Sequence, residues 1–451
     1  MKKMEAALKK VSIHNLGCKV NSYEAESMEQ MLKEAGYEII PFSEENVADV
    51  YIINTCSVTN IADRKSRQML HKAKKMNPDA IVVAAGCYVQ ADSEACLKDS
   101  AVDIVLGNNM KINIVEALDN YYKDKKDDAF VIDINKDSDY EELNINTVNE
   151  HSRAYIKIQD GCNQFCSYCI IPYVRGRIRS RDMKEIYAEV ERLVAKGYKE
   201  IVLTGIHLTS YGMDNNKGSL LEVIKMLHDI EGLERIRLGS LEPRVVTDDF
   251  AREMSKLNKV CPHFHLSLQS GCDKTLKAMN RKYSTKEYYE CCVRLRKYYD
   301  NPAITTDVIV GFPGESEEDF AQTRKFLEKV GFYEMHIFKY SRRKGTVADK
   351  MPDQIDEKIK ALRSNELLEL EKNMSYNYRK SYLGKDTTVL LEEEIEHDGQ
   401  KFYAGYTPNY LRVILEKDAV DALTKEAVNT VLNIKLLSVE DDGILLRAAI
   451  I

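Results

Sequence analysis

Three closely spaced cysteines, Cys162, Cys166 and Cys169, are the residues of this chain best suited to chemistry. Thiolates at this spacing can bind three corners of a [4Fe–4S] cluster, which normally takes four cysteines. Because no fourth cysteine lies nearby in the sequence, one iron would keep an open coordination position, which indicates chemistry rather than a structural role. A zinc site would need a fourth Cys or His at short range, so the spacing favours the cluster over zinc or a disulfide pair.

Three further cysteines each follow a short apolar segment that predicts a β-strand. In an open parallel sheet the carboxyl ends of the strands lie along one edge, where ligands bind. Thiolates far apart in the sequence can therefore converge there, although each cysteine taken alone would more often be a small buried apolar residue. These residues are Cys18, Cys56 and Cys87, which follow strands predicted over 11–16, 50–54 and 81–85.

Residues 9–122 alternate strand-like and helix-like segments, which predicts an N-terminal doubly wound parallel sheet with helices on both faces. We expect a helix over 21–35, with a capping box from Asn21 to Glu24 at its start. Residues 123–150 are rich in Asp, Lys and Asn and predict a linker with one strand over 130–134.

A longer alternation over 151–350 predicts six β/α units, which would form a central partial (β/α)6 barrel. Residues 351–379 are charged and predict a connecting helix, beginning at about Asp353. Over 380–451, short strand-like runs separated by Asp-Gly turns predict a small all-β barrel. The predicted fold class is therefore α/β with a C-terminal all-β part.

The composition restricts the class of protein. The 451 residues carry a formal net charge of −7, so any nucleic-acid binding must come from local basic patches. No apolar run is long enough to span a membrane, and no signal-type apolar stretch follows the charged first ten residues. Eleven cysteines without an export signal predict a reducing compartment, the cytoplasm, and metal ligands or catalysis rather than disulfides.

The Cys-x3-Cys-x2-Cys spacing, with Tyr168 just before the last cysteine, resembles the radical S-adenosylmethionine (SAM) enzymes. In that superfamily the open iron chelates the amino and carboxylate groups of SAM, which the reduced cluster cleaves to a 5′-deoxyadenosyl radical. The segments 16–21, 53–59, 85–88 and 160–176 resemble the methylthiotransferase family, and the match covers nearly the whole chain in the family's order: methylthiotransferase domain, radical SAM domain, TRAM domain. This resemblance implies that Cys18, Cys56 and Cys87 hold a second [4Fe–4S] cluster, whose open iron carries the sulfur to be inserted.

The SAM pocket is expected at the carboxyl ends of the barrel strands, where barrel enzymes place their active sites. A fork of guanidinium donors suits a carboxylate, and the family resemblance assigns Arg281 to the SAM carboxylate and Ser240 and Glu242 to a polar pair at a strand end. Without the family, Arg281 would be interpreted as a surface arginine. The full predicted set is Tyr168, Thr204, Gly205, Ser240, Glu242, Gln269 and Arg281.

Two groups of residues are predicted to contact RNA. A run of arginines follows the cysteine loop, where a phosphate backbone would have to lie, and aromatic residues of the C-terminal barrel could stack on bases. Most charge runs are only solvated faces, but this one adjoins the predicted active site. The residues are Arg175, Arg177, Arg179 and Arg181, and Tyr403, Tyr406 and Tyr410.

The resemblance implies a tRNA methylthiotransferase that uses two SAM molecules per turnover, a sulfur donor, and an electron donor such as flavodoxin or ferredoxin. The runs 17–24 and 405–410 resemble the subfamily acting on N6-threonylcarbamoyladenosine at position 37, beside the anticodon. A threonylcarbamoyl group carries a carboxylate, so its pocket should present a cation, and the segment 175–181 is the nearest basic candidate.

Three alternatives to this functional assignment stay open. Two lie within the family, the isopentenyladenosine subfamily and the subfamily that modifies a ribosomal-protein aspartate. An alternative of another class is a non-enzymatic iron–sulfur RNA-binding regulator, which would need no SAM pocket.

Overall fold

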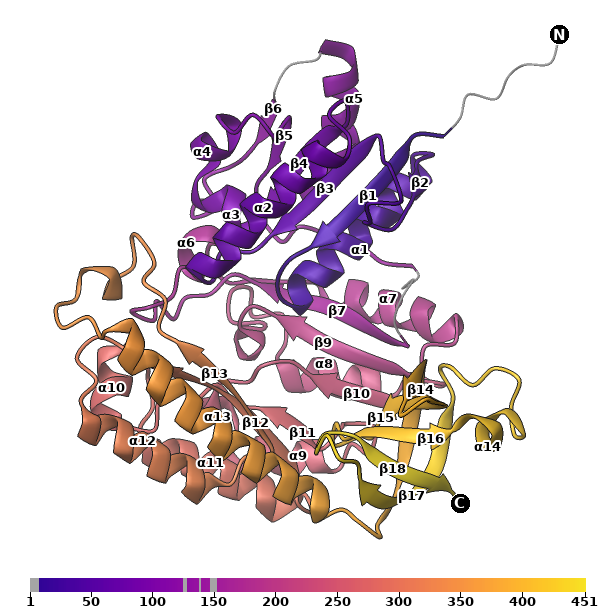
Figure 1. Cartoon of the computed structure of the whole chain (residues 1–451), viewed down its shortest axis with the longest axis vertical. Helices are drawn as coiled ribbons and strands as arrows, with labels where there is room; N and C mark the ends of the chain where they lie inside the picture. Colours follow the sequence, from indigo (N-terminus) through magenta and orange to yellow (C-terminus); the bar gives the residue numbers. More distant parts are fainter. Residues whose placement is uncertain (1–7, 125–127, 138, 147–151) are drawn as a thin grey trace.

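The computed structural model describes residues 8–124, 128–137, 139–146 and 152–451. Three parts follow one another along the chain (Figure 1): an N-terminal sheet with helices, a central incomplete barrel, and a small β-barrel at the C-terminus. This arrangement confirms the predicted α/β fold class with a C-terminal all-β part. No helix in the part of the chain described is long and apolar enough to cross a membrane.

The N-terminal sheet has six parallel strands in the order β2-β1-β3-β4-β5-β6. Its central strands β3 and β4 are buried along their whole length, which explains their continuous apolar runs. The strands are β1 (Lys10–Asn15), β2 (Glu38–Ile39), β3 (Val50–Thr55), β4 (Ile81–Gly86), β5 (Ile104–Leu106) and β6 (Asp128–Phe130). The helices are α1 (Lys19–Glu34), α2 (Asn60–Met76), α3 (Cys87–Ala91), α4 (Ser93–Leu97) and α5 (Ile114–Asp124).

The central part contains six parallel strands that curve without closing. Backbone hydrogen-bond ladders join β10-β9-β7 and β11-β12-β13, and single bridges at Ile236–Val260 and Leu241–Leu266 connect the two groups. The strands are β7 (Arg153–Asp160), β9 (Glu200–Gly205), β10 (Arg235–Leu238), β11 (His263–His265), β12 (Ala303–Val310) and β13 (Glu334–Lys339), with the short antiparallel β8 (Arg179–Ser180) beside β7. The covering helices are α6 (Ile171–Val174), α7 (Met183–Ala195), α8 (Leu220–His228), α9 (Asp248–Ser255), α10 (Asp273–Ala278), α11 (Thr285–Tyr298) and α12 (Glu317–Val330).

The helix α13 (Glu357–Lys380) connects the central part to the C-terminal barrel (Figure 1). That barrel closes in the order β14-β15-β16-β18-β17 around its own apolar core. Its elements are β14 (Asp386–His397), β15 (Gln400–Tyr406), β16 (Arg412–Glu416), α14 (Lys417–Asp421), β17 (Val431–Val439) and β18 (Leu446–Ile450).

Three local predictions are wrong. Asn21 and Glu24 do not form a capping box, because α1 already begins at Lys19 and both side chains point into buried contacts. The strand expected over 130–134 is β6 at Asp128–Phe130, and it adds a sixth strand to the N-terminal sheet. The connecting helix begins later than predicted, since the Asp356 side chain caps its first turn.

A candidate active site between two cysteine triads

The first cysteine triad lies at one edge of the N-terminal sheet. Cys18 precedes α1, Cys56 follows β3, and Cys87 opens α3 directly after β4. Since β1, β3 and β4 are neighbouring parallel strands, their carboxyl ends meet at this edge. Burial, together with the neighbouring Cys87 and Cys18 thiols, raises the pKa of Cys56 to about 11. Such a thiol becomes a thiolate more readily beside a metal or a cation, and the three thiols lie at one edge of the sheet, where a shared ligand could be bound.

Two arginines from the central barrel hold the loops that carry this triad. Arg175 donates from Nε to Cys87 Sγ at 3.3 Å and from Nη2 to Asn21 Oδ1 at 2.7 Å, one turn after Cys18. Arg343 donates from Nη2 to Ser57 Oγ at 2.8 Å, next to Cys56. The barrel therefore positions each of the three cysteine loops of the N-terminal sheet.

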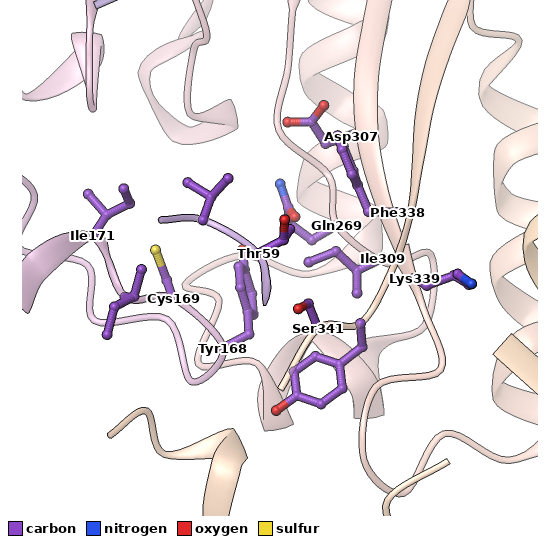
Figure 2. A pocket seen from close by; sticks show the side chains of 13 residues that line it. Thr59, Tyr168, Cys169, Ile171, Gln269, Asp307, Ile309, Phe338, Lys339 and Ser341 are labelled. Carbon is purple, nitrogen blue, oxygen red and sulfur yellow. The ribbon is translucent and has the colours of Figure 1, made fainter. Parts of the chain in front are cut away.

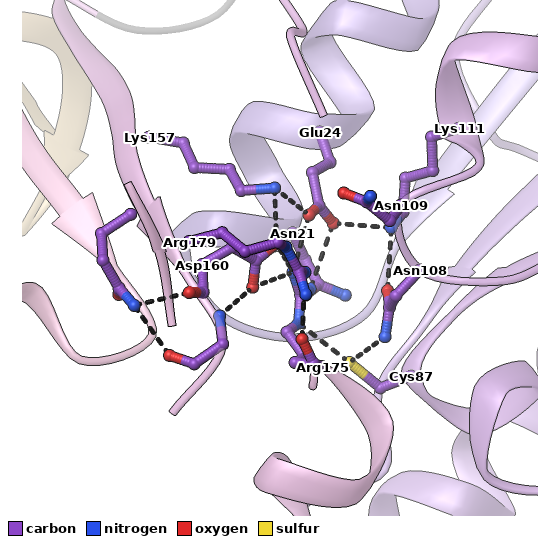
Figure 3. Close-up of polar contacts among 12 residues, drawn as sticks. Asn21, Glu24, Cys87, Asn108, Asn109, Lys111, Lys157, Asp160, Arg175 and Arg179 are labelled. Carbon is purple, nitrogen blue, oxygen red and sulfur yellow. Dashed lines mark hydrogen bonds and ion pairs between the residues drawn. The ribbon is translucent and has the colours of Figure 1, made fainter. Parts of the chain in front are cut away.

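A buried charge network surrounds Arg175 (Figure 3). Its Nη1 lies 2.7 Å from Glu24 Oε1 and 3.2 Å from Asp160 Oδ2. Lys157 Nζ lies 2.9 Å from Glu24 Oε1 and 2.7 Å from Asp160 Oδ2, and Lys111 Nζ lies 3.1 Å from Glu24 Oε2. These cations lower the pKa of Glu24 against the effect of burial, so both carboxylates stay ionised. With Arg179, whose Nη2 lies 3.9 Å from Asp160 Oδ2, four cations thus face these two carboxylates beside Cys87.

The N–H donors and cations around Cys87 fit an anionic metal–sulfur cluster. Besides Arg175, Asn108 donates from Nδ2 to Cys87 Sγ at 3.5 Å, so two N–H groups point at one sulfur. Hydrogen bonds to cluster sulfurs and nearby charge are the means by which proteins tune such clusters. The surplus of buried positive charge would be offset by thiolates and the cluster they bind. Cys18, Cys56 and Cys87 are therefore suitable ligands for a [4Fe–4S] cluster.

The second triad, Cys162, Cys166 and Cys169, lies in the loop after β7. Arg281 donates from Nη1 to Cys166 Sγ at 3.2 Å, and the Gln164 N–H donates to Cys162 Sγ at 3.5 Å. Burial raises the pKa of Cys162 to about 11, although the Gln164 N–H opposes the change. A buried thiol with N–H donors aimed at it again suits a thiolate that ligates a metal cluster.

The shape of this loop is fixed by the segment after α10. The Ser167 N–H donates to Met279 O at 3.0 Å, and Asn280 Nδ2 donates to Phe165 O at 2.9 Å. Phe165 adopts a positive φ of 48°, a conformation that few residues other than glycine tolerate. These contacts hold three cysteines within one short loop in a defined arrangement.

A cavity of about 250 Å³ opens beside the second triad (Figure 2). Tyr168, Cys169, Gln269 and Ile309 line it from the barrel, and Thr59 lines it from the N-terminal part. A mostly apolar lining with a few polar groups suits a purine nucleoside. Of the residues predicted to bind SAM, Tyr168 and Gln269 lie here.

A larger cavity of about 600 Å³ lies between the first triad, the barrel interior and the C-terminal barrel. Asp307 of β12 lines both cavities, so the two adjoin. The lining of the larger cavity includes three residues predicted to bind SAM, one cysteine of the first triad, and several polar side chains. They are Cys18, Lys19, Thr204, Gly205, Ser240, His263, His265, His336 and Tyr410.

Two residues predicted to bind SAM are outside the linings of both cavities. Glu242 is paired with Arg244, Oε1 to Nε at 2.6 Å. Arg281 contacts Cys166 and, through Nε, the Tyr283 hydroxyl at 2.9 Å. Arg281 thus lies beside a cysteine sulfur of the second triad, while Glu242 is engaged by Arg244.

Residues 156–327 match the Radical SAM superfamily, and residues 10–107 match the Uncharacterized protein family UPF0004. The Threonylcarbamoyladenosine tRNA methylthiotransferase MtaB of Bacillus subtilis (strain 168) is 39% identical, with 95% of this chain and 93% of that protein covered. A tRNA-2-methylthio-N(6)-dimethylallyladenosine synthase of Clostridium botulinum (strain Langeland / NCTC 10281 / Type F) is 38% identical, with 90% and 92% covered. The chain belongs to the radical SAM methylthiotransferase family.

The fold of this methylthiotransferase also resembles a solved structure. The radical S-adenosylmethionine methyltransferase TsrM from Kitasatospora setae, solved with cobalamin and a [4Fe-4S] cluster, aligns with a TM-score of 0.55 at 13% identity. The alignment covers 74% of this chain and 76% of that chain. At this identity the likeness concerns the fold alone.

The predicted arginine patch of the methylthiotransferase needs correction. Arg175, Arg179 and Arg181 are each 0% exposed. Arg181 forms an ion pair with buried Glu189, and Arg179 donates to Arg175 O at 3.0 Å. These three guanidinium groups are held inside the protein and cannot contact a phosphate backbone in this arrangement. Of the four arginines only Arg177 is exposed, with its guanidinium 4.6 Å from the centre of the Phe165 ring.

The tyrosines predicted to bind RNA differ in how accessible their rings are. Tyr403 is buried in the C-terminal barrel, and its hydroxyl donates to Asp421 Oδ1 at 3.0 Å, so its ring is not open for stacking. Tyr410 stacks on Tyr406 with ring centres 4.7 Å apart and on His263 at 4.8 Å. Tyr410 therefore joins the C-terminal barrel to the central barrel and lines the larger cavity of the methylthiotransferase.

The sequence interpretation missed several charged or ionisable residues that line the larger cavity. His265, Asp307 and His336 come from β11, β12 and β13, and their side-chain donor and acceptor atoms lie within 4.8 Å of one another. Lys19 enters from the start of α1, and burial, followed by Arg237 and Arg153, lowers its pKa to about 8. His265 ends β11 and His336 lies within β13, but a lone His or Lys in a strand carries little information without the neighbouring strands.

Proposed function

We propose that this chain inserts a methylthio group at C2 of N6-threonylcarbamoyladenosine at position 37 of tRNA. The observation that carries the proposal is the placement of two cysteine triads at two adjoining cavities. One cavity has the size and lining for a nucleoside cofactor, and the other is large enough for a modified adenosine. The similarity to the methylthiotransferase of Bacillus subtilis over 95% of the chain supports this substrate.

The cofactors of the proposed reaction are two [4Fe–4S] clusters and SAM. Cys18, Cys56 and Cys87 would ligate the sulfur-carrying cluster, and Cys162, Cys166 and Cys169 the cluster that binds SAM. When bound, these groups supply the methyl group, the sulfur and the hydrogen abstraction that exchange C2–H for C2–SCH3, giving S-adenosylhomocysteine, methionine and 5′-deoxyadenosine from two SAM molecules. The chain orients them, with Arg281 beside Cys166 and Arg175 beside Cys87.

The proposed reaction needs further partners. A reductant such as flavodoxin or ferredoxin would supply electrons, and a sulfur donor would restore the inserted sulfur. Exposed Arg177 and partly buried Tyr406 and Tyr410 are the predicted RNA-contact residues that this structure leaves accessible. All eleven cysteines are free, in keeping with a reducing compartment, and we place the enzyme in the cytoplasm.

Isopentenyladenosine at position 37 is the second candidate substrate, since relatives acting on that class of nucleoside are 38% identical to the chain. An isopentenyl group needs an apolar pocket, whereas the larger cavity is lined by Lys19 and by imidazole and carboxylate groups. This polar lining favours the threonylcarbamoyl substituent, which carries a carboxylate.

Deleting the gene is expected to remove the 2-methylthio form of threonylcarbamoyladenosine from cellular tRNA, with the parent nucleoside accumulating. Nucleoside mass spectrometry of tRNA from wild-type and deletion cells measures both. A plasmid copy of the gene should restore the modification, and a copy with Cys166→Ala should not. Loss of the 2-methylthio isopentenyl nucleoside instead would refute the substrate assignment.

A further inference from the structure

The larger cavity contains a cation without a partner among the described residues. Lys19 lines this cavity and forms no ion pair or hydrogen bond through its Nζ within that part of the chain, whereas the other charged side chains nearby are paired. Glu334 pairs with Arg379 at 2.8 Å, and Asp307 lies 3.3 Å from His265 Nε2. A partly buried ammonium without a carboxylate in contact with it is costly, and a carboxylate ligand would relieve that cost.

The neighbouring arginines cannot take the role of Lys19. Arg237 is bound to Glu200 at 2.6 Å, and Arg153 is bound to Glu392 at 2.7 Å. Arg175, which lies in the segment that the sequence suggested for this carboxylate, is 0% exposed and committed to Glu24. Among the described residues of this region, Lys19 is the cation that remains available to a ligand in the cavity.

The helix itself gives no reason for a lysine at this position. Lys19 is the first residue of α1, and no acidic residue occupies the first turn. The positive end of a helix dipole disfavours a cation there, so Lys19 does not stabilise the helix. A lysine that is unfavourable for its own helix and unpaired in a cavity points to a bound anion.

The geometry of the proposed substrate brings its carboxylate to the same place. In N6-threonylcarbamoyladenosine the ureido N–H of the threonine can form an internal hydrogen bond to N1, which turns the substituent toward the edge of the base that carries C2. A group that delivers sulfur to C2 then has the substituent as its neighbour. Lys19 directly follows Cys18, the ligand proposed for the sulfur-carrying cluster.

We infer that Lys19 binds the threonine carboxylate of the substrate and so selects the threonylcarbamoyl nucleoside. This inference rests on the proposed function. The side chains of His265 and His336 line the same cavity. His265 is engaged by Asp307 through Nε2 and by Thr305 through Nδ1, so His336 is the imidazole nearer to being open to the polar groups of the substituent. The chemical class that the site recognises is a carboxylate-bearing adenosine.

The test uses an anticodon stem-loop RNA that carries threonylcarbamoyladenosine and the same RNA with the threonine carboxylate converted to its methyl ester. The reconstituted wild-type enzyme should prefer the acid in kcat/KM by about 10- to 100-fold, the range for a charge-assisted contact. The Lys19→Gln variant should lose that preference: its kcat/KM should fall on the acid RNA and stay within about twofold of the wild-type value on the ester RNA. Lys19→Arg should restore part of the preference, and Lys33→Gln, at the exposed far end of α1, should behave as wild type.

Equal discrimination by Lys19→Gln and wild type would overturn the inference, as would an equal loss on both RNAs. Iron per chain and RNA affinity by fluorescence anisotropy are measured alongside. If the variant loads less iron and its activity falls for that reason, the affinities for the acid and the ester RNA still report the preference. A wild-type enzyme that acts only on an isopentenyl RNA would refute the proposed function, whereas one that treats acid and ester alike would refute the role of Lys19 alone.

Discussion

Replacing Cys56 by alanine should abolish methylthio insertion while the protein still cleaves SAM, whereas replacing Cys166 by alanine should abolish both. Cys56 lies at the edge of the N-terminal sheet, and Cys166 lies in the barrel loop beside Arg281. Because the two triads are held by different elements, each should load iron on its own. Wild-type protein should bind about eight irons, and the variant with alanine at 162, 166 and 169 about four.

Iron analysis and chromatography of the products measure this separation. The products are 5′-deoxyadenosine, S-adenosylhomocysteine and the modified nucleoside. Cys96→Ala is the matched control, since Cys96 is buried in the apolar core of the N-terminal part and belongs to neither triad. A folded Cys56→Ala protein with four irons that fails to cleave SAM would contradict the assignment of the two triads.

Arg175→Met should destabilise the protein and impair the cluster at the first triad. The substitution leaves Glu24 and Asp160 buried with fewer partners and removes one of the two N–H donors to Cys87. Removing one partner from a buried ion pair costs about 3 kcal/mol or more in the free energy of unfolding. Urea denaturation and iron per chain measure the two effects, and about half of the bound iron should be lost.

Arg177→Met serves as the control for the same segment. Its guanidinium is exposed and contacts only the face of Phe165 among the interactions described, so the loss of stability should stay at about 1 kcal/mol or less. An Arg175→Met protein as stable as wild type and with full iron would show that the buried network does not support the first triad.

Much of the fold could be predicted from the sequence because its signals are local. The apolar runs of β3 and β4 and the turns of the C-terminal barrel indicated the right elements, although α1 begins two residues earlier than expected and α13 four residues later. The convergence of Cys18, Cys56 and Cys87 followed from the rule that parallel strands end at one edge. β6 was misplaced, because a three-residue strand in a charged segment has almost no periodicity.

The site was harder to predict because partners far apart in the sequence decide what a charge does. Arg175 lies in a run of arginines typical of a surface patch, yet it forms a buried ion pair with Glu24, which is 151 residues away. Arg181 has a nearer partner, Glu189, but the charge pattern alone does not show that this pair is buried. Lys19 had no motif of its own, and its importance emerges only from the absence of a partner among the described residues of the folded protein. Pairing of this kind depends on tertiary structure, which a linear pattern of charges does not contain.

The most direct measurement of the central claim uses purified, reconstituted enzyme with two tRNAs, one carrying threonylcarbamoyladenosine and one carrying isopentenyladenosine at position 37. With SAM, a sulfur source and a reductant present, mass spectrometry of the digested tRNA should show a gain of methylthio on the threonylcarbamoyl nucleoside, together with 5′-deoxyadenosine and S-adenosylhomocysteine. Methylthio insertion into the isopentenyl nucleoside alone, or SAM cleavage without insertion into either tRNA, would contradict the account.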